Sequence, residues 1–330
     1  MYITEKSLFA SFPTPFRAFG KRSSPTSFDL VARSFDDSVL RGLKALNPPA
    51  SNTPLIGLSW LSSAVDFLAS VHVEARDVLA NLSSSDDTIK LYLDGSVKVL
   101  DLCNFVSAEI ERLRQRRLLI NFALLLLDDE KRSPEKLRRA VNSLSDEPKT
   151  GTRQKNVDPN GLVRDLADRF LSPLPSGRIS NAEELARRTL YAVGVVTVFV
   201  FGAVVSALSG GGSAKIDVSA TGFPWADSLS QLRSAILNRR VLEEIGDVET
   251  RAGRARDTVN DVGQGNEASH AKLGNAVKEL RAASERLTEG LDRLANGVNG
   301  VFRLVLGTRD GILDAHRKRH EGDYEKKQKK

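Results

Sequence analysis

Apolar residues recur every three or four positions along most of this 330-residue chain, which is the spacing of one face of an α-helix. The pattern begins near Ser27, where one stripe consists of Leu30, Val31, Phe35, Val39, Leu43 and Leu46. The prolines at 48 and 49 end this helix, because proline cannot continue the hydrogen-bond ladder. Similar stripes predict a second helix from about 54 to 82 and a third from about 86 to 127.

The third predicted helix ends in the apolar run "LLINFALLLL", residues 118–127. Ten residues are too few to span a hydrocarbon core of about 30 Å, so the run predicts a buried helix end. From 133 to about 160 the composition turns polar, which predicts an exposed loop. A short helix, "LVRDLADRFL", follows, and "GFPWADSLSQLRSAILNRRVLEEIGDVETRA" predicts another helix after Pro224.

The predicted helix 182–209 contains nineteen consecutive residues without a formal charge, 190–208. Nineteen helical residues rise about 28 Å, so the segment is long enough to cross a membrane. The residues that define it are Leu190, Gly194, Val198, Phe199, Phe201, Gly202, Ser206 and Leu208. Its small residues allow close helix contact in lipid or in a protein core. We favour the core, because at least four other amphipathic helices need an apolar partner, and a membrane span is the alternative.

The last predicted helix has the most regular pattern, with steps that alternate between four and three residues. Its apolar positions form a candidate interaction seam: Leu273, Val277, Leu280, Leu287, Leu291, Leu294, Val298, Val301, Val305 and Ile312. A repeat of this kind predicts a helix packed along one side. The pattern does not decide whether the seam faces its own bundle, which we favour, or another chain.

The predicted fold is therefore all-α, an elongated bundle of long helices over residues 27–315. Aromatic residues make up only 6% of the chain, which disfavours a large β-sandwich or barrel. Residues 1–26 contain a single acid, Glu5, and predict a disordered arm, with an organelle transit segment as the alternative. Residues 316–330 hold seven Lys or Arg against three Asp or Glu and predict a basic disordered tail that could attract anionic lipid.

Residues that carry chemistry are sparse. The one cysteine, Cys103, is flanked by leucines and predicts a buried structural thiol. The four histidines are scattered without metal-ligand spacing, and "SGGGSAK" follows a helix rather than a strand, so it predicts a helix end and not a phosphate loop. We expect no metal, no cofactor, no catalytic residues and no enzyme activity. The arginines of "RLRQRR" lack interleaved aromatics, so we expect no nucleic-acid partner.

Four blocks of the sequence resemble, in order, those of the plant BYPASS-like family of BYPASS/ROH-type proteins. They are "LSWLSSAVDFLASVH", "LYLDGSVKVLDLCNFVSAEIERL", "TLYAVGVVTVFVFGAVVSALSG" and "EGLDRLANGVNGVFRLVLGTRDGILD". The resemblance implies a helical plant protein without known catalytic activity. It also implies a role in growth and development, with relatives linked to exocytosis through an exocyst subunit and others to stress responses.

The hypothesis that follows is a regulatory adaptor that binds protein partners through its helices, such as an exocyst subunit or a signalling protein. It would be cytoplasmic, or associated with the cytosolic face of the endoplasmic reticulum or plasma membrane, through the hydrophobic helix and the basic tail. The alternatives are a single-pass membrane protein of the secretory or plastid system and, less favoured, an enzyme acting on a small signalling precursor.

Overall fold

The structure, a computed structural model, describes most of the chain after the N-terminal 25 residues. The described residues are 26–47, 56–80, 82, 85–128, 133–145, 158–171, 179–209, 220–237, 242–262 and 267–328. Within them the fold is all-α, as predicted, with one isolated β-bridge between Ile56 and Leu242. The helices are α1 (Ser27–Ala45), α2 (Leu58–Ala80), α3 (Asp86–Asp128), α4 (Pro134–Ser145), α5 (Pro159–Phe170), α6 (Ala182–Ser209), α7 (Ala226–Leu237), α8 (Glu243–Val262) and α9 (Glu267–Gln328).

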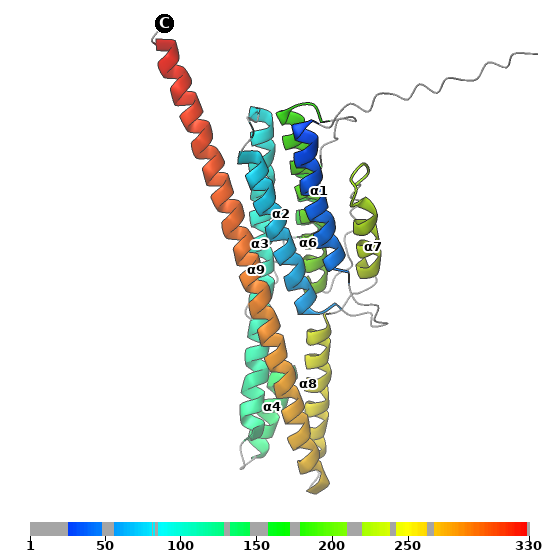
Figure 1. Ribbon diagram of the computed structural model, residues 1–330. Helices are drawn as coiled ribbons and strands as arrows, with labels where there is room; N and C mark the ends of the chain where they lie inside the picture. The colour runs from blue at the N-terminus through cyan, green and yellow to red at the C-terminus, as the bar shows by residue number, and fades with distance from the viewer. Residues whose placement is uncertain are drawn as a thin grey trace, which may run out of the picture.

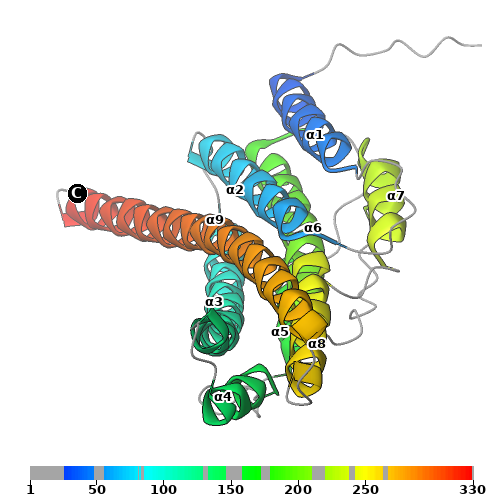
Figure 2. The same cartoon turned by 90° about the horizontal axis from the view of Figure 1, so that it is seen from below.

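The two longest helices, α3 and α9, lie side by side along the molecule and give it its elongated shape (Figure 1). α5 and α6 pack on α3, α2 lies between α6 and α9, and α1 lies outside α2 and α6, whereas α4 packs on the second half of α3 and α8 on the first half of α9. Seen from below, α9 passes across α2 and α3 (Figure 2). The C-terminal part of α9 projects beyond the other helices (Figure 1).

The bounds of α6 match the predicted helix 182–209, and its neighbours are α1, α2, α3 and α5. Of the eight residues that define the hydrophobic segment, five are buried and three, Phe199, Gly202 and Ser206, are half-buried. In length and composition α6 could cross a membrane, with a mean hydropathy of 2.3, and 78% of its most apolar window is buried inside the structure. The helices of this chain therefore cover most of its surface.

Phe170, at the end of α5, lies between two glycines of other helices. A Cβ atom on Gly95 of α3 would lie 2.5 Å from its ring, and one on Gly194 of α6 would lie 2.4 Å from its Cβ. Non-bonded carbon atoms do not approach so closely in folded proteins, so both positions require glycine if Phe170 is to stay fully buried. This contact explains the glycine in the "YLDGSVKVLDLCN" block.

A buried carboxylate joins α1, α6 and the segment before α7. Asp36 is only 4% exposed and accepts hydrogen bonds from Arg188 Nη2 at 2.7 Å and from Trp225 Nε1 at 3.0 Å. The Arg188 guanidinium also lies 4.1 Å from the centre of the Phe223 ring, a cation–π distance. The charged side chain of Arg188, near the start of the hydrophobic helix, thus has its partners inside the protein.

The starts of α2 and α8 bind each other, although 186 residues separate them. The Leu58 N–H donates to both carboxylate oxygens of Glu244, at 2.9 and 3.0 Å, and the Glu243 N–H donates to the Ile56 carbonyl at 3.0 Å. A carboxylate at a helix N-terminus satisfies N–H groups that have no partner within the helix. Each helix start is therefore completed by a distant part of the chain.

Four expectations differ from the structure. The predicted loop 133–160 contains α4, because Leu137, Ala140 and Leu144 form one apolar face that packs on the bundle. The single helix expected after Pro224 is described as two helices, α7 as far as Leu237 and α8 from Glu243.

The run 118–127, expected to be buried, is buried on one face only. The tail 316–330, expected to be disordered, continues α9 as far as Gln328. Its Lys, Arg, Glu and Gln residues are good helix formers, and extending an existing helix needs no new nucleus. Of the predicted arm 1–26, residues 1–25 lie outside the described part of the chain.

Candidate functional site

The second half of α3 exposes a row of large apolar side chains that we call the α3 stripe: Leu118, Phe122 and Leu125. Their exposed fractions are 58%, 40% and 69%. Steps of four and three residues place them on one face of the helix. The opposite face of the same run is buried against the bundle through Ile120, Ala123, Leu124 and Leu127.

Polar contacts flank the α3 stripe on both sides. Towards α4, the Arg139 guanidinium lies 5.7 Å from the centre of the Phe122 ring. Towards α9, the Ser284 hydroxyl donates to Asn121 Oδ1 at 3.1 Å, and Arg281 pairs with Asp128. An apolar row with a polar rim is typical of surfaces that bind another protein.

The candidate seam on α9 lies elsewhere and is covered. Nine of its ten residues are at most 4% exposed, and only Ile312 is half-buried. α2, α3 and α8 contact α9 along this side. Two glycines allow the close approach of α2: a Cβ on Gly290 would lie 2.7 Å from Leu58 Cδ1, and one on Gly297 would lie 3.1 Å from Val65 Cγ1. The seam up to Val305 therefore packs within the chain and leaves no free surface there.

The arginines of "RLRQRR" bind neighbouring helices and helix turns rather than standing free. Arg116 shows this most fully, because its side chain is only 13% exposed and it pairs with Glu249 of α8 at 3.0 Å. Its guanidinium also donates to the Ser143 and Leu144 carbonyls at the end of α4, at 3.3 and 2.9 Å. Arg114 reaches Asp292 and Arg117 reaches Thr288, both on α9. The sequence shows the cluster but not these partners.

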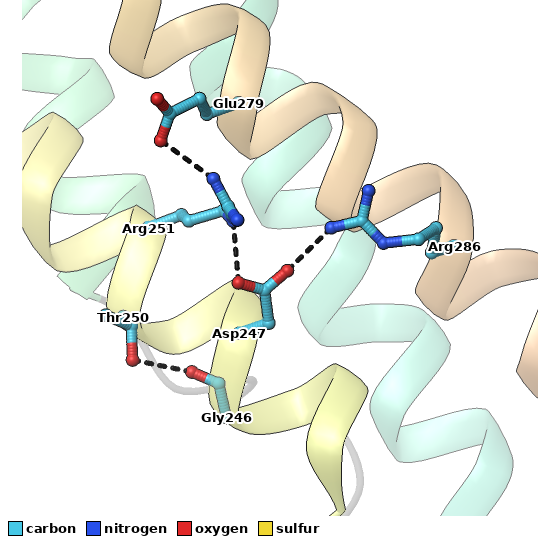
Figure 3. Close-up of polar contacts among 6 residues, drawn as sticks. All are labelled: Gly246, Asp247, Thr250, Arg251, Glu279 and Arg286. Atoms are coloured by element: carbon cyan, nitrogen blue, oxygen red, sulfur yellow. Dashed lines mark hydrogen bonds and ion pairs between the residues drawn. The ribbon is translucent and has the colours of Figure 1, made fainter. Parts of the chain in front are cut away.

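A polar groove of about 850 Å³ lies between α8, α9 and the start of α2, and a chain of ion pairs runs along it (Figure 3). Asp247 accepts from Arg251 Nε and from Arg286 Nη2, each at 2.7 Å, and Arg251 Nη1 donates to Glu279 at 2.7 Å. Burial acts to raise the pKa of Asp247, but the hydrogen bonds from the two arginines outweigh it and lower that pKa. These paired charges join α8 to α9.

Two described residues of types that often serve catalysis, Cys103 and His72, are buried and uncharged near neutral pH. Burial raises the pKa of the Cys103 thiol to about 12, so it does not form a thiolate near neutral pH. Burial lowers the pKa of His72 to about 4, and its Nε2 lies 3.1 Å from Thr197 Oγ1. Because that hydroxyl donates to the Val193 carbonyl, it accepts from a neutral His72. Among the described residues, no group of three or more His, Cys, Asp or Glu could hold a metal.

Comparison with known proteins places the chain among plant sequences. A family model described as Protein ROH1-like matches residues 22–161. Protein BPS1, chloroplastic, from Arabidopsis thaliana is 26% identical over an alignment 329 residues long. The alignment covers 93% of this chain and 90% of that protein. UPF0496 protein 4 from rice, Oryza sativa subsp. japonica, is 31% identical over 286 residues, and its indica counterpart has the same values. The aligned region is 80% of this chain but 61% of each rice protein. No solved structure gives a significant match.

Proposed function

Because the chain belongs to the BYPASS/ROH1-like family of plant proteins, we propose that it is a non-enzymatic regulator of plant growth and development. It acts as an adaptor that binds a protein partner on the α3 stripe. The observation that supports this is the exposure of three large apolar side chains on one helix face, while the α9 seam is buried. Such a face suits an amphipathic helix with its own apolar residues three and four positions apart.

The partner of this adaptor is a helical protein, and an exocyst subunit or a signalling protein are the candidates that the family resemblance suggests. An acidic residue beside the partner's apolar face would suit Arg139, which already covers one edge of the α3 stripe. The inert states of Cys103 and His72 support binding rather than catalysis.

Two charged substitutions on the α3 stripe, Leu118→Glu with Leu125→Glu, test the proposal in plants that lack the native protein. Both side chains are more than half exposed, so the variant should fold, but a buried glutamate would disfavour a docked partner. We expect loss of developmental rescue and of the partners found by proximity labelling, at an unchanged protein level. Leu30→Glu with Val31→Glu is the matched control, because these α1 residues are 55% and 40% exposed and lie outside the stripe. Full rescue by the stripe variant would overturn the proposal.

A single-pass membrane protein is the second candidate, because α6 is long and apolar enough to cross a bilayer. The pairing of Arg188 with Asp36 and the burial of α6 favour a folded bundle that is soluble or bound to the cytosolic face of a membrane. Carbonate extraction of the membrane fraction separates the two, since a spanning helix stays with the lipid. Recovery of the protein in the pellet after carbonate would favour the span.

The compartment is tested by imaging tagged protein with and without residues 1–25. Thr26 should be kept, because its hydroxyl accepts from the Asp29 N–H and caps α1. We propose the cytosol or a cytosolic membrane face, and the name of the Arabidopsis relative makes the plastid the alternative. Plastid import of the longer chain alone would favour that alternative.

A further inference from the structure

A second hollow lies where α9 leaves the bundle, at the far end of the molecule from the polar groove. It has a volume of about 370 Å³ and is bounded by the end of α2, the start of α3, Leu190 of α6 and the part of α9 after Val305. Small-molecule sites range from about 300 to 1,000 Å³, so this cavity is large enough to hold a ligand.

The α9 wall of this cavity contains two glycines, Gly307 and Gly311, that packing within the chain does not require. A Cβ atom at either position would meet nothing within 4 Å. This contrasts with Gly290 and Gly297 of the same helix, where a Cβ would press on α2. Since glycine weakens a helix, two glycines here keep the wall open at a cost in helix stability.

The remaining wall is mostly aliphatic, with a few polar groups. Its apolar side chains include Leu79, Leu82, Ile89, Leu190 and Ile312, and Tyr92 is its one aromatic residue. Tyr92 is 5% exposed and Thr88 is 2% exposed, so both are fixed parts of the wall. A wall of this kind, without stacked rings, suits a flexible aliphatic chain better than a flat ring system.

The polar lining lacks acids and includes two basic side chains, Arg76 and His316, which both reach solvent. Arg76 pairs with Asp77 at 2.8 Å, and His316 lies 3.2 Å from Asp86. Both carboxylates are more than 60% exposed, and exposed ion pairs of this type contribute little to stability. The guanidinium can therefore exchange Asp77 for an anionic ligand group at small cost.

We propose that this cavity binds an aliphatic monocarboxylic acid, with its chain along Leu79, Ile89 and Ile312 and its carboxylate at Arg76 and His316. The chain replaces water on the apolar walls and fills the space that Gly307 and Gly311 leave open. The site is separate from the α3 stripe, so this inference stands or fails independently of the proposed adaptor role.

Isothermal titration of the full-length chain with decanoate tests the proposal, with decan-1-ol as the neutral probe of equal chain length. We expect saturable one-to-one binding of decanoate and about tenfold weaker binding of the alcohol, the loss expected for one charge-assisted contact. Arg76→Gln should remove most of that difference. No saturable binding, or equal affinity for the acid and the alcohol, would overturn the proposal.

Filling the cavity provides the second test. Gly307→Leu with Gly311→Leu adds side chains where nothing lies within 4 Å, so the fold should persist and the melting temperature should rise. We expect decanoate binding to be lost. Gly274→Leu with Gly300→Leu is the matched control, because these α9 glycines are also unobstructed and lie outside the cavity, and it should bind like the native chain. A filled variant that melts cooperatively and still binds decanoate with native affinity would place the ligand elsewhere.

Discussion

Around α6, the side chains of several helices meet in an apolar core that continues into the other half of the molecule, where arginines and carboxylates also connect the helices. In the first half Phe170 is fully buried between Gly95 and Gly194. In the second half, Arg116 and the Asp247 pairs link α3, α4, α8 and α9 near the surface. The apolar half depends mainly on close packing, whereas the other half adds ion pairs near the surface to the same apolar core, so the two should respond differently to substitution, pH and salt.

Truncation of Phe170 should produce the largest loss of stability. Phe170→Ala empties a close-packed site and should lower the free energy of unfolding by about 3–5 kcal/mol. Phe122→Ala is the matched control in the other half, because Phe122 is 40% exposed, and it should cost less than about 1 kcal/mol. Denaturant unfolding measures both. Similar losses for the two variants would show that the site of Phe170 is no more closely packed than the exposed site of Phe122.

Acid should weaken the apolar half through His72. Burial holds the pKa of His72 at about 4 in the folded chain, below the 6.5 of the unfolded chain, so between these values only the unfolded chain takes up the proton. The contribution of neutral His72 to the free energy of unfolding is complete above pH 6.5. It decreases by about 3 kcal/mol as the pH falls to about 4. Denaturant titrations at pH 7 and pH 4 measure the loss, and His72→Gln should remove this part of the pH dependence. If the free energy of unfolding of the variant depended on pH as strongly as that of the native chain, His72 would not be its cause.

Removal of an arginine should affect the other half moderately. Arg116→Ala leaves the Ser143 and Leu144 carbonyls without this donor and should lower the free energy of unfolding by about 1–2 kcal/mol. Arg138→Ala should change it by less than about 0.5 kcal/mol, because its side chain is 71% exposed. Unfolding at low and high salt checks both, and salt should reduce only the part of the Arg116 effect that comes from Glu249. Equal losses of stability for the two variants would show that the contacts of Arg116 between helices contribute no more than the exposed pair of Arg138.

Two glycines of α9 give the smallest expected effects, with opposite signs. Gly300→Ala should raise stability by about 0.5–1 kcal/mol, because it meets no neighbour and improves the helix. Gly290→Ala should lower stability, because its Cβ would lie 2.7 Å from the Leu58 side chain. Thermal melts compare them. A stabilising Gly290→Ala would show that α2 can shift away from α9.

The helices were predictable because their periodicity is local, and α6 and the α9 seam follow their patterns closely. What covers each face was not predictable, because that depends on residues far away in the sequence. Leu124 and Leu125 belong to the same run, yet one is 3% and the other 69% exposed. Periodicity places them on different faces but does not say which face meets α9.

For the candidate sites too, local residue clusters were visible in the sequence, but contacts with distant residues were not. "RLRQRR" was visible as a cluster, but its partners lie on α4, α8 and α9. The α3 stripe could have been suspected from the length of the run, because apolar residues all around a helix need cover on every side. The cavity beside Gly307 could not have been predicted, since it exists only where α2 ends and α3 begins beside α9.

The mutual contact between the starts of α2 and α8 has a consequence for synthesis on the ribosome. The α2 N–H at Leu58 gains its carboxylate only after Glu244 has been made, and the faces of α2 and α3 that pack on α9 stay uncovered until α9 emerges. The nascent chain therefore carries partly uncovered apolar helix faces from the synthesis of α2 until α9, which begins at Glu267. Its folding is completed from the C-terminal end, so a premature stop before α9 yields an aggregation-prone fragment rather than a smaller working protein.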